Sequence, residues 1–302
     1  MRLSEAFQLF ITDLIAVGRS PYTLAWYRQY IGRLISFFGD CSLDAVSVDD
    51  MRAFLASLRS VKKKYTTEQT LSPATVAGYV RAIRRFYSWL EENEHITPNG
   101  NIGRRLKMPR LPKSEPKSIS DGDLRKMISV SCNSPRDFAI VLFLADTGCR
   151  IGGLEELRLS NLNLEQRQAV VTEKGRVTRT VFFIEEVASA LRAWLDVRKS
   201  DTDFVFVADD GKRLTRWGFR AIFDRLKLRA DVAGRANPHS FRHRFARSYI
   251  KQGGDLGTLS DLMGHSDVLV TKQAYAIFQV HELQRKHDDY SPLHDLGANA
   301  ND

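Results

Sequence analysis

Apolar residues recur at helical spacing along the first third of the chain. In residues 21–38 they stand at every third or fourth position, which predicts an amphipathic helix with one buried face. The same spacing predicts a small bundle of helices at residues 4–17, 21–38, 48–60 and 73–93. Ser20 and Ser72 are each followed by proline, the pattern of an N-cap and a first helical residue, and Ser47 begins a capping box.

A basic, proline-rich stretch at residues 107–118 interrupts this helical pattern. It holds three prolines and four basic residues, which favour an extended linker. The chain has 302 residues, of which 43% are hydrophobic, so it can bury two cores. We therefore expect an all-helical domain at residues 1–106 and a second domain at 119–302.

The second domain mixes helical and strand patterns. The apolar run 138–145 predicts a buried helix that Gly148 ends, which presents Arg150. Residues 168–172 and 177–184 are rich in β-branched and aromatic residues and flank a turn at 173–176, so they predict a β-hairpin with Lys174 at its tip. The expected fold class is mainly α, with an α+β second domain and a small antiparallel sheet.

The segment after Ala236 predicts a helix with a cationic face. Asn237 is a candidate N-cap, and His239, Arg242 and His243 then share one side of the helix. A helix N-terminus attracts phosphate. A second stripe of apolar residues at 256–263 ends at Gly264, which leaves His265 just past a helix end.

Ten residues later, Tyr275 lies in a short predicted helix, residues 271–278. Six side chains that suit attack on a DNA phosphodiester therefore follow one another along the chain: Arg150, Lys174, His239, Arg242, His265 and Tyr275. Tyrosine is a poor nucleophile at its usual pKa of about 10, and a phosphodiester repels anions. Nearby cations would help with both problems, because they favour the tyrosinate and neutralise the phosphate charge.

These residues resemble the tyrosine recombinase family, which includes phage integrases and the Xer-type bacterial recombinases. The segment ending at Arg150 is similar to the TGxR box of the family, and residues 239–243 match HxLRH with Phe241 at the Leu place. Residues 263–265 match the LGH box. The resemblance implies that residues 1–106 are a helical core-binding domain and that 119–302 are the catalytic domain.

The resemblance also implies a role for each group. Tyr275 is then the nucleophile that forms a 3′-phosphotyrosyl intermediate, and Arg150 and Arg242 fork onto the phosphate oxygens. His265 donates a hydrogen bond to the phosphate, His239 helps to take the Tyr275 proton, and Lys174 protonates the leaving 5′-oxygen. Strand exchange then passes through a Holliday junction. No metal is implied, because the arginines neutralise the charge that grows on the phosphate, and no nucleotide cofactor is implied, because the covalent ester keeps the bond energy.

Two positions depart from the family pattern. Gly153 stands where a glutamate usually follows the first arginine by three residues, and Glu155 or Glu156 is the expected substitute. The spacing from His265 to Tyr275 is one residue longer than expected, which a helix start can absorb. Tyr290 is the fallback nucleophile.

The charge balance agrees with a DNA partner. The chain has 45 basic and 36 acidic residues and a formal net charge of +9. We expect phosphate contacts from one group of basic residues: Lys62, Lys63, Lys64, Arg81, Arg84, Arg85, Lys107, Arg110 and Lys113. The resemblance implies double-stranded DNA with inverted-repeat core sites and a homotetramer on two paired sites. A tail at about 280–302 would contact a neighbouring protomer. Whether an accessory protein takes part is left open by the sequence.

The remaining sequence signals concern location. Three cysteines, Cys41, Cys132 and Cys149, form no disulfide pattern, which indicates a reducing cytoplasm, and the resemblance implies that this cytoplasm is bacterial or archaeal. No membrane-spanning run is present in the sequence.

Several other functions fit parts of the pattern. A type IB topoisomerase uses similar chemistry, and a DNA-binding accessory protein with an impaired active site would fit Gly153. A zinc site of His239, His243 and His265 lacks an acidic or cysteine ligand, and a metal-dependent nuclease would need clustered carboxylates. The DNA target and the biological event are left open.

Overall fold

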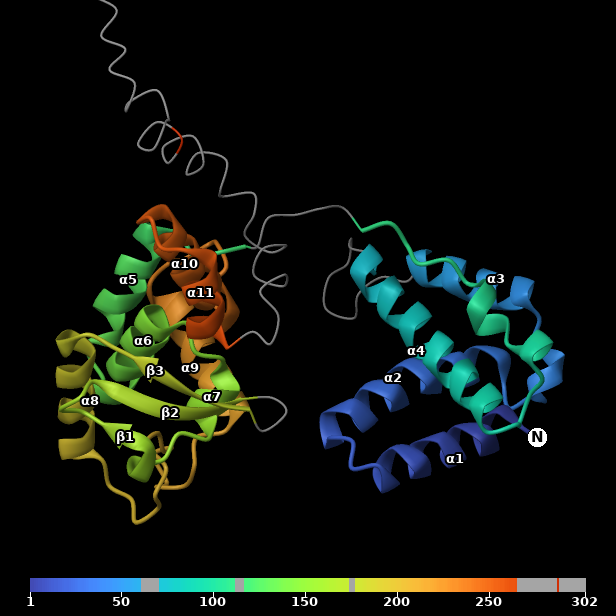
Figure 1. The fold of residues 1–302 in the computed structure, drawn as a ribbon, viewed down its shortest axis with the longest axis horizontal. Coiled ribbons are helices and arrows are strands. Elements are labelled where there is room, and N and C mark those ends of the chain that lie inside the picture. Colours follow the sequence, from blue (N-terminus) through green and yellow to red (C-terminus); the bar gives the residue numbers. More distant parts are fainter. Residues whose placement is uncertain (61–70, 112–116, 174–176, 265–286, 288–302) are drawn as a thin grey trace, which may run out of the picture. The chain divides into compact units, whose positions relative to one another are not determined.

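The chain divides into two compact units (Figure 1), and each has its own apolar core. The computed structural model describes residues 1–60, 71–111, 117–173, 177–264 and 287. The first unit is Met1–Lys113 and the second is Ser114–Asp302. The division between them falls inside the basic, proline-rich stretch.

Four α-helices and three short 3₁₀ turns build the described part of the first unit. The α-helices are α1 (Leu3–Ala16), α2 (Pro21–Phe38), α3 (Val48–Ser60) and α4 (Pro73–Glu92). The 3₁₀ turns are Leu43–Ala45, Pro98–Gly100 and Ile102–Arg105. Helix α4 contacts the other three α-helices, so it is the centre of the bundle. The four predicted helices are confirmed, with boundaries that differ by at most one residue.

Side-chain caps explain why these helices begin where they do. The Ser20 hydroxyl accepts a hydrogen bond from the Thr23 amide, and the Ser72 hydroxyl accepts one from the Thr75 amide. At α3, the Asp50 amide donates to the Ser47 hydroxyl while the Asp50 carboxylate accepts from the Ser47 amide. Each cap satisfies an amide that the first helical turn leaves unpaired.

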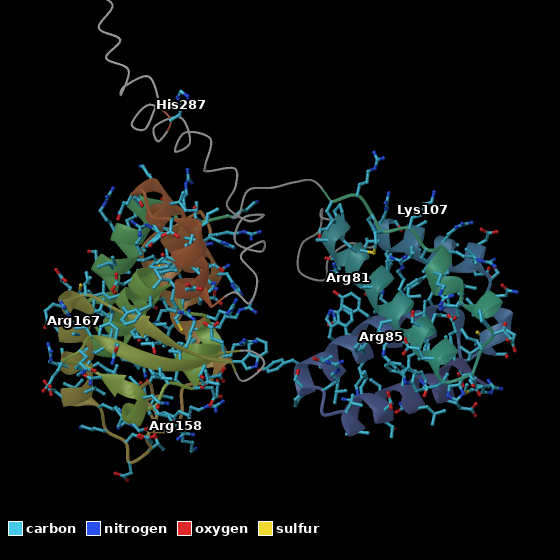
Figure 2. All side chains as sticks on the ribbon, in the orientation of Figure 1. Arg81, Arg85, Lys107, Arg158, Arg167 and His287 are labelled. Atoms are coloured by element: carbon cyan, nitrogen blue, oxygen red, sulfur yellow. The ribbon has the colours of Figure 1, made fainter. Side chains whose placement is uncertain are left out.

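Aromatic side chains fill the core of the first unit. The fully buried Phe86 ring of α4 lies 6.0 Å from Phe7 and 5.4 Å from Phe10, measured between ring centroids. The Trp89 indole N–H donates to the Asp13 carboxylate at 2.9 Å, which satisfies its polar edge. The opposite side of α4 is exposed and basic, and Figure 2 labels Arg81 and Arg85 on it.

The second unit combines seven described helices with a small sheet. The helices are α5 (Asp121–Ser131), α6 (Pro135–Thr147), α7 (Ile151–Glu155), α8 (Glu185–Val197), α9 (Arg216–Arg229), α10 (Pro238–Lys251) and α11 (Leu256–Met263). The strands are β1 (Leu162–Asn163), β2 (Gln168–Glu173) and β3 (Val177–Phe182), after a 3₁₀ turn at Leu159–Asn161. Helix α6 packs against α5, α8 and α10 and forms the middle of the core.

Strands β2 and β3 pair antiparallel as predicted, and β1 adds a third strand to give the order β1-β2-β3. The register pairs Val171 with Arg179 and Glu173 with Val177. Alternate residues of β2 are buried, namely Ala169, Val171 and Glu173. Glu173 is therefore a strand residue that faces inward, and its assignment to the turn 173–176 was wrong because its backbone pairs in the ladder. Lys174 lies outside the described residues.

Gly148 ends α6 in the left-handed conformation, with φ at +57°. A Cβ at this position would lie 2.6 Å from a ring carbon of Phe245 on α10, so only glycine allows this close packing. The chain then enters α7 with Arg150 as its N-cap residue. In the described parts of the chain, no helix is long and apolar enough to cross a membrane.

We expect Phe86→Ala to destabilise the first unit by about 3–5 kcal/mol, because it leaves a cavity among buried aromatic rings. Urea denaturation followed by circular dichroism measures the loss. Phe37→Ala is the matched control, since the Phe37 side chain is about half exposed, and it should cost less than half as much. Equal losses in the two variants would contradict this description of the core.

Candidate active site

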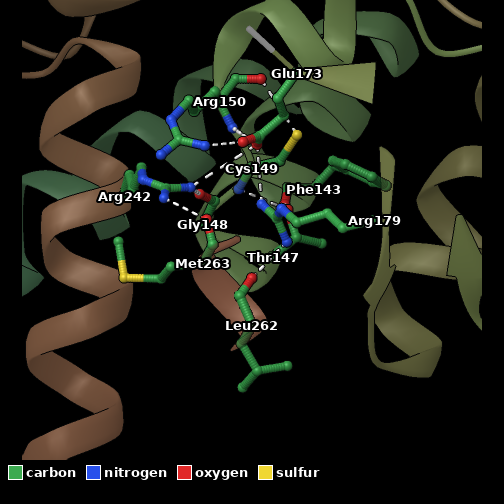
Figure 3. A network of polar contacts seen from close by, with 10 residues as sticks. All are labelled: Phe143, Thr147, Gly148, Cys149, Arg150, Glu173, Arg179, Arg242, Leu262 and Met263. Carbon is green, nitrogen blue, oxygen red and sulfur yellow. Dashed lines mark hydrogen bonds and ion pairs between the residues drawn. The ribbon is translucent and has the colours of Figure 1, made fainter. Parts of the chain in front are cut away.

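The candidate site begins at Arg150, directly after the end of α6. The Arg150 guanidinium contacts the Glu173 carboxylate, and the Arg150 backbone amide donates to the same carboxylate at 3.1 Å (Figure 3). The Glu173 side chain is only 3% exposed, whereas that of Arg150 is 32% exposed. The buried carboxylate therefore fixes both the main chain and the side chain of Arg150, whose guanidinium stays partly accessible.

Arg242 reaches the same place from α10. Its Nη1 donates to the Gly148 carbonyl at 2.7 Å and its Nη2 donates to the Met263 carbonyl at 2.6 Å. Its Nη1 also lies 4.0 Å from Glu173 Oε1. Arg242 thus joins the end of α6 to the end of α11 while it faces the carboxylate.

A third arginine, Arg179 of β3, completes the cluster. Its Nη2 donates to Glu173 Oε1 at 3.1 Å, and its Nη1 donates to the Leu262 carbonyl near the end of α11. Among the described residues, the cluster sets three guanidinium groups around one carboxylate. Its side chains are largely buried, so the positive excess favours a bound anion.

Burial also changes the proton affinities of these groups. Burial and the neighbouring Arg179 charge lower the Arg150 pKa, and burial lowers the Arg179 pKa. Burial raises the pKa of the adjacent Cys149 thiol to about 11, although Arg179, Arg242 and Arg150 oppose that rise. The Cys149 thiol is therefore protonated at neutral pH and unreactive.

Two histidines of α10 lie close enough to Arg242 for its charge to act on them, and His239 is the predicted catalytic one. Burial lowers the His239 pKa below its usual value, and the Arg242, Arg216 and Arg150 charges lower it further. The His243 pKa is also lowered, mostly by burial and then by the neighbouring His239 and Arg242. Both imidazoles are therefore neutral near pH 7, and a neutral imidazole can accept a proton.

Glu155 and Glu156 do not support Arg150. Glu155 Oε1 lies 3.1 Å from Arg213 and accepts from the Arg216 amide, while Glu156 pairs with Arg213 at 2.8 Å. The expectation that one of them substitutes for a carboxylate at position 153 was therefore wrong. The carboxylate beside Arg150 comes from a strand 23 residues further along the chain, so helical spacing around Arg150 could not identify it.

The structure brings together three of the six predicted catalytic residues, Arg150, His239 and Arg242. The others lie outside the described residues: Lys174, His265 and Tyr275. Sequence reasoning gave no role to Glu173 or Arg179. One signal was present in the sequence, because Glu173 continues the inward alternation of Ala169 and Val171. Within the described ranges, no three His, Cys, Asp or Glu side chains gather as metal ligands would.

Family comparisons match both units. The phage integrase family matches residues 117–281, and the N-terminal SAM-like domain of phage integrases matches residues 7–92. Tyrosine recombinase XerC of Oceanobacillus iheyensis is 30% identical over 273 residues, which cover 85% of this chain and 86% of the relative.

Solved structures share the fold. The Tn1549 transposon integrase in complex with transposon right end DNA aligns with a TM-score of 0.73 at 19% identity, over 94% of this chain and 99% of that one. A lambda integrase tetramer bound to a Holliday junction aligns with a TM-score of 0.71 at 17% identity, over 88% of this chain and 78% of that one.

We expect glutamate at position 153 to destabilise the second unit. A Cβ on Gly153 would lie 2.9 Å from Cys149 Sγ and 3.2 Å from Val171 Cβ, and a carboxylate would enter a space that Glu173 already occupies. Gly153→Ala should cost about 1–3 kcal/mol of folding free energy from crowding. Gly153→Glu should cost more, because two buried carboxylates repel.

The urea midpoints of the two variants measure this difference. Gly152→Ala is the matched control, because the nearest atom to its Cβ is 3.7 Å away and alanine favours the helix. Gly152→Ala should be neutral or stabilising. Equal stability of Gly153→Glu and Gly153→Ala would show that the added carboxylate avoids Glu173.

Proposed function

Because the chain belongs to the phage integrase family of tyrosine recombinases and is a site-specific DNA recombinase, we propose that it cuts and rejoins DNA through a 3′-phosphotyrosyl intermediate. The observation that supports this best is the convergence of Arg150 and Arg242 beside one buried carboxylate. Such a cluster has more positive than negative charge and suits the phosphate of a DNA backbone.

The described residues suit two steps of this chemistry. The Arg150 guanidinium is partly exposed and held by Glu173, so it can neutralise the charge that grows on the phosphate oxygens. Arg242 is buried and fixed by two carbonyls, so its charge is preorganised in the same place. His239 is neutral near pH 7 and can accept the proton of the nucleophile.

Three further residues are assigned from the family boxes in the sequence. We assign Tyr275 as the nucleophile, His265 as a hydrogen-bond donor to the phosphate, and Lys174 as the acid for the leaving 5′-oxygen. The attack forms a bond from the Tyr275 oxygen to phosphorus and breaks the bond from phosphorus to the 5′-oxygen. The ester keeps the bond energy, so rejoining needs no nucleotide cofactor, and the cations take the place of a metal.

The first unit offers basic residues for the DNA backbone. Arg81, Arg84 and Lys107 are exposed in this unit, whereas the Arg85 guanidinium pairs with Glu92 at 2.8 Å. Lys107 and Arg110 also line a cavity of about 720 Å³ beside α3 and α4. These residues support a phosphate-binding surface. The candidates Lys62, Lys63, Lys64 and Lys113 lie outside the described residues.

We further propose a homotetramer on two paired DNA sites with inverted-repeat cores, which exchanges strands through a Holliday junction. The lambda integrase tetramer on such a junction, which shares this fold, supports the proposal. The tail at 280–302 would contact a neighbouring protomer. The DNA substrate and the three free cysteines favour the cytoplasm as the place of action. Glu173 beside Arg150 removes the main reason to expect an impaired site.

A covalent adduct with DNA is the direct test of this function. Wild type and Tyr275→Phe are incubated with a library of nicked suicide substrates, with and without EDTA, and adducts resistant to SDS are recovered and sequenced. We expect only the wild type to form 3′ adducts, with or without EDTA, because the variant lacks the attacking oxygen but should still bind DNA.

Tyr290→Phe is the matched control and should form adducts like the wild type. An adduct with Tyr275→Phe would assign the nucleophile to another tyrosine. Loss of adducts in EDTA would support a metal-dependent nuclease instead.

The lowered His239 pKa predicts the pH dependence of cleavage. A lowered pKa keeps the imidazole neutral to more acid pH, so the single-turnover rate should fall on the acid side with a midpoint below the usual histidine value of about 6.5. His239→Gln should be slower and should lose this acid limb. His243→Gln is the matched control and should keep it, and a midpoint above pH 6.5 in the wild type would contradict the assignment.

A further inference from the structure

Glu173 is an unusual residue for its place in the fold. It occupies an inward position of β2, in line with the buried Ala169 and Val171, and the residue as a whole, main chain included, is 7% exposed. A buried carboxylate is costly unless cations and hydrogen bonds compensate for the lost hydration. Its presence at an apolar position therefore calls for a role that an apolar residue could not fill.

The contacts of Glu173 identify that role. Oε1 accepts from the Arg150 backbone amide and from Arg179, both at 3.1 Å, and Oε2 accepts from the Arg150 guanidinium. Two of these three donors belong to Arg150. The carboxylate thus sets the direction in which the Arg150 guanidinium leaves the end of α6.

Gly153 explains why the carboxylate comes from β2. A Cβ on Gly153 would lie 2.9 Å from Cys149 Sγ, 3.2 Å from Val171 Cβ and 3.5 Å from Glu173 Cγ. The space that a side chain at position 153 would occupy is therefore filled by Cys149 and by Val171 and Glu173 of β2. Glycine at position 153 and glutamate at position 173 are two parts of one arrangement.

Arg179 holds this carboxylate from the other side. It stands on β3, with its side chain 9% exposed, and it also donates to the Leu262 carbonyl. A Cβ on Gly264 would lie 2.5 Å from Arg179 Cδ, so the arginine packs closely against the end of α11. Through Arg179, Glu173 is tied to the helix end that directly precedes residue 265.

We propose that Glu173 is the positioning residue for Arg150, in place of a carboxylate at position 153, and that Arg179 locks Glu173 to the end of α11. This inference rests on the proposed function of Arg150 as a phosphate clamp. Glu173 does not touch the DNA and acts by orienting the arginine that does.

Glu173→Gln is the first test, because glutamine keeps the shape and removes the charge. We expect it to bind a nicked suicide substrate as the wild type does but to cleave it about tenfold or more slowly in a single turnover at saturating protein, as when the partner of a ligating group is lost. Glu173→Asp, which keeps the charge, should recover part of the rate. A wild-type rate in Glu173→Gln would overturn the proposal.

Asp137→Asn is the matched control. Asp137 is a buried carboxylate held by Arg136 and Arg225, but it lies in the first turn of α6, at the opposite end from Arg150. This variant should lose stability without losing its cleavage rate. A similar loss of rate in both variants would show that any buried ion pair matters and would overturn a specific role for Glu173.

A double-mutant cycle tests whether Glu173 acts through Arg150. Once Arg150→Ala has removed the clamp, adding Glu173→Gln should change the remaining rate by less than about twofold. A merely structural role would instead multiply the two losses. Full multiplication would overturn the proposal.

Chemical modification gives a readout that needs no DNA cleavage. Phenylglyoxal modification of Arg150, mapped by mass spectrometry, should be several-fold faster in Glu173→Gln than in the wild type, because the guanidinium is released. Arg158, which pairs with Asp203 elsewhere in the second unit, should react equally in both. Unchanged Arg150 reactivity would overturn the tether, whereas failure of the wild type to form a DNA adduct would overturn only the proposed function.

Discussion

The attraction between one buried carboxylate and three guanidinium groups organises the second unit. Glu173 lies in β2, and its arginine neighbours come from the start of α7, from β3 and from α10. Arg179 and Arg242 in turn bind main-chain carbonyls at the ends of α6 and α11. Elements that are distant in sequence thus meet at a single charge, which must be matched because it is buried.

This arrangement also explains how the protein holds an excess of positive charge. Guanidinium groups that face each other repel, and burial lowers the pKa of both Arg150 and Arg179. Carbonyl acceptors and one carboxylate limit the cost without cancelling the excess. The remaining positive potential is fixed before a phosphate arrives, so little reorganisation is needed when charge develops during the reaction.

Local signals could be predicted from the sequence, and long-range ones could not. The caps at Ser20, Ser72 and Asn237 depend on residues three positions apart, so they marked helix starts correctly. Helices α5, α8 and α9 escaped prediction, although Asp121–Ser131 has Ser120 as its N-cap.

The motifs around Arg150, His239 and Arg242 could be recognised because their residues follow one another in a fixed order along the chain. The partner of Arg150 is 23 residues away on a strand and depends on how β2 packs beside α7. Glu155 and Glu156 were nearer in sequence but are bound to Arg213. Only the packed fold distinguishes these carboxylates.

The apolar side chains of helix α11 pack outside the main core of the second unit. Its Leu259 and Met263 pack with Ala246 and Ile250 of α10 in a small cluster that is separate from the main core. Because its buried apolar partners are on α10, the hydrogen bonds from Arg179 and Arg242 to the Leu262 and Met263 carbonyls tie its end to the arginine cluster. Loss of either arginine should therefore let the amide hydrogens of α11 exchange at a lower free-energy cost than global unfolding.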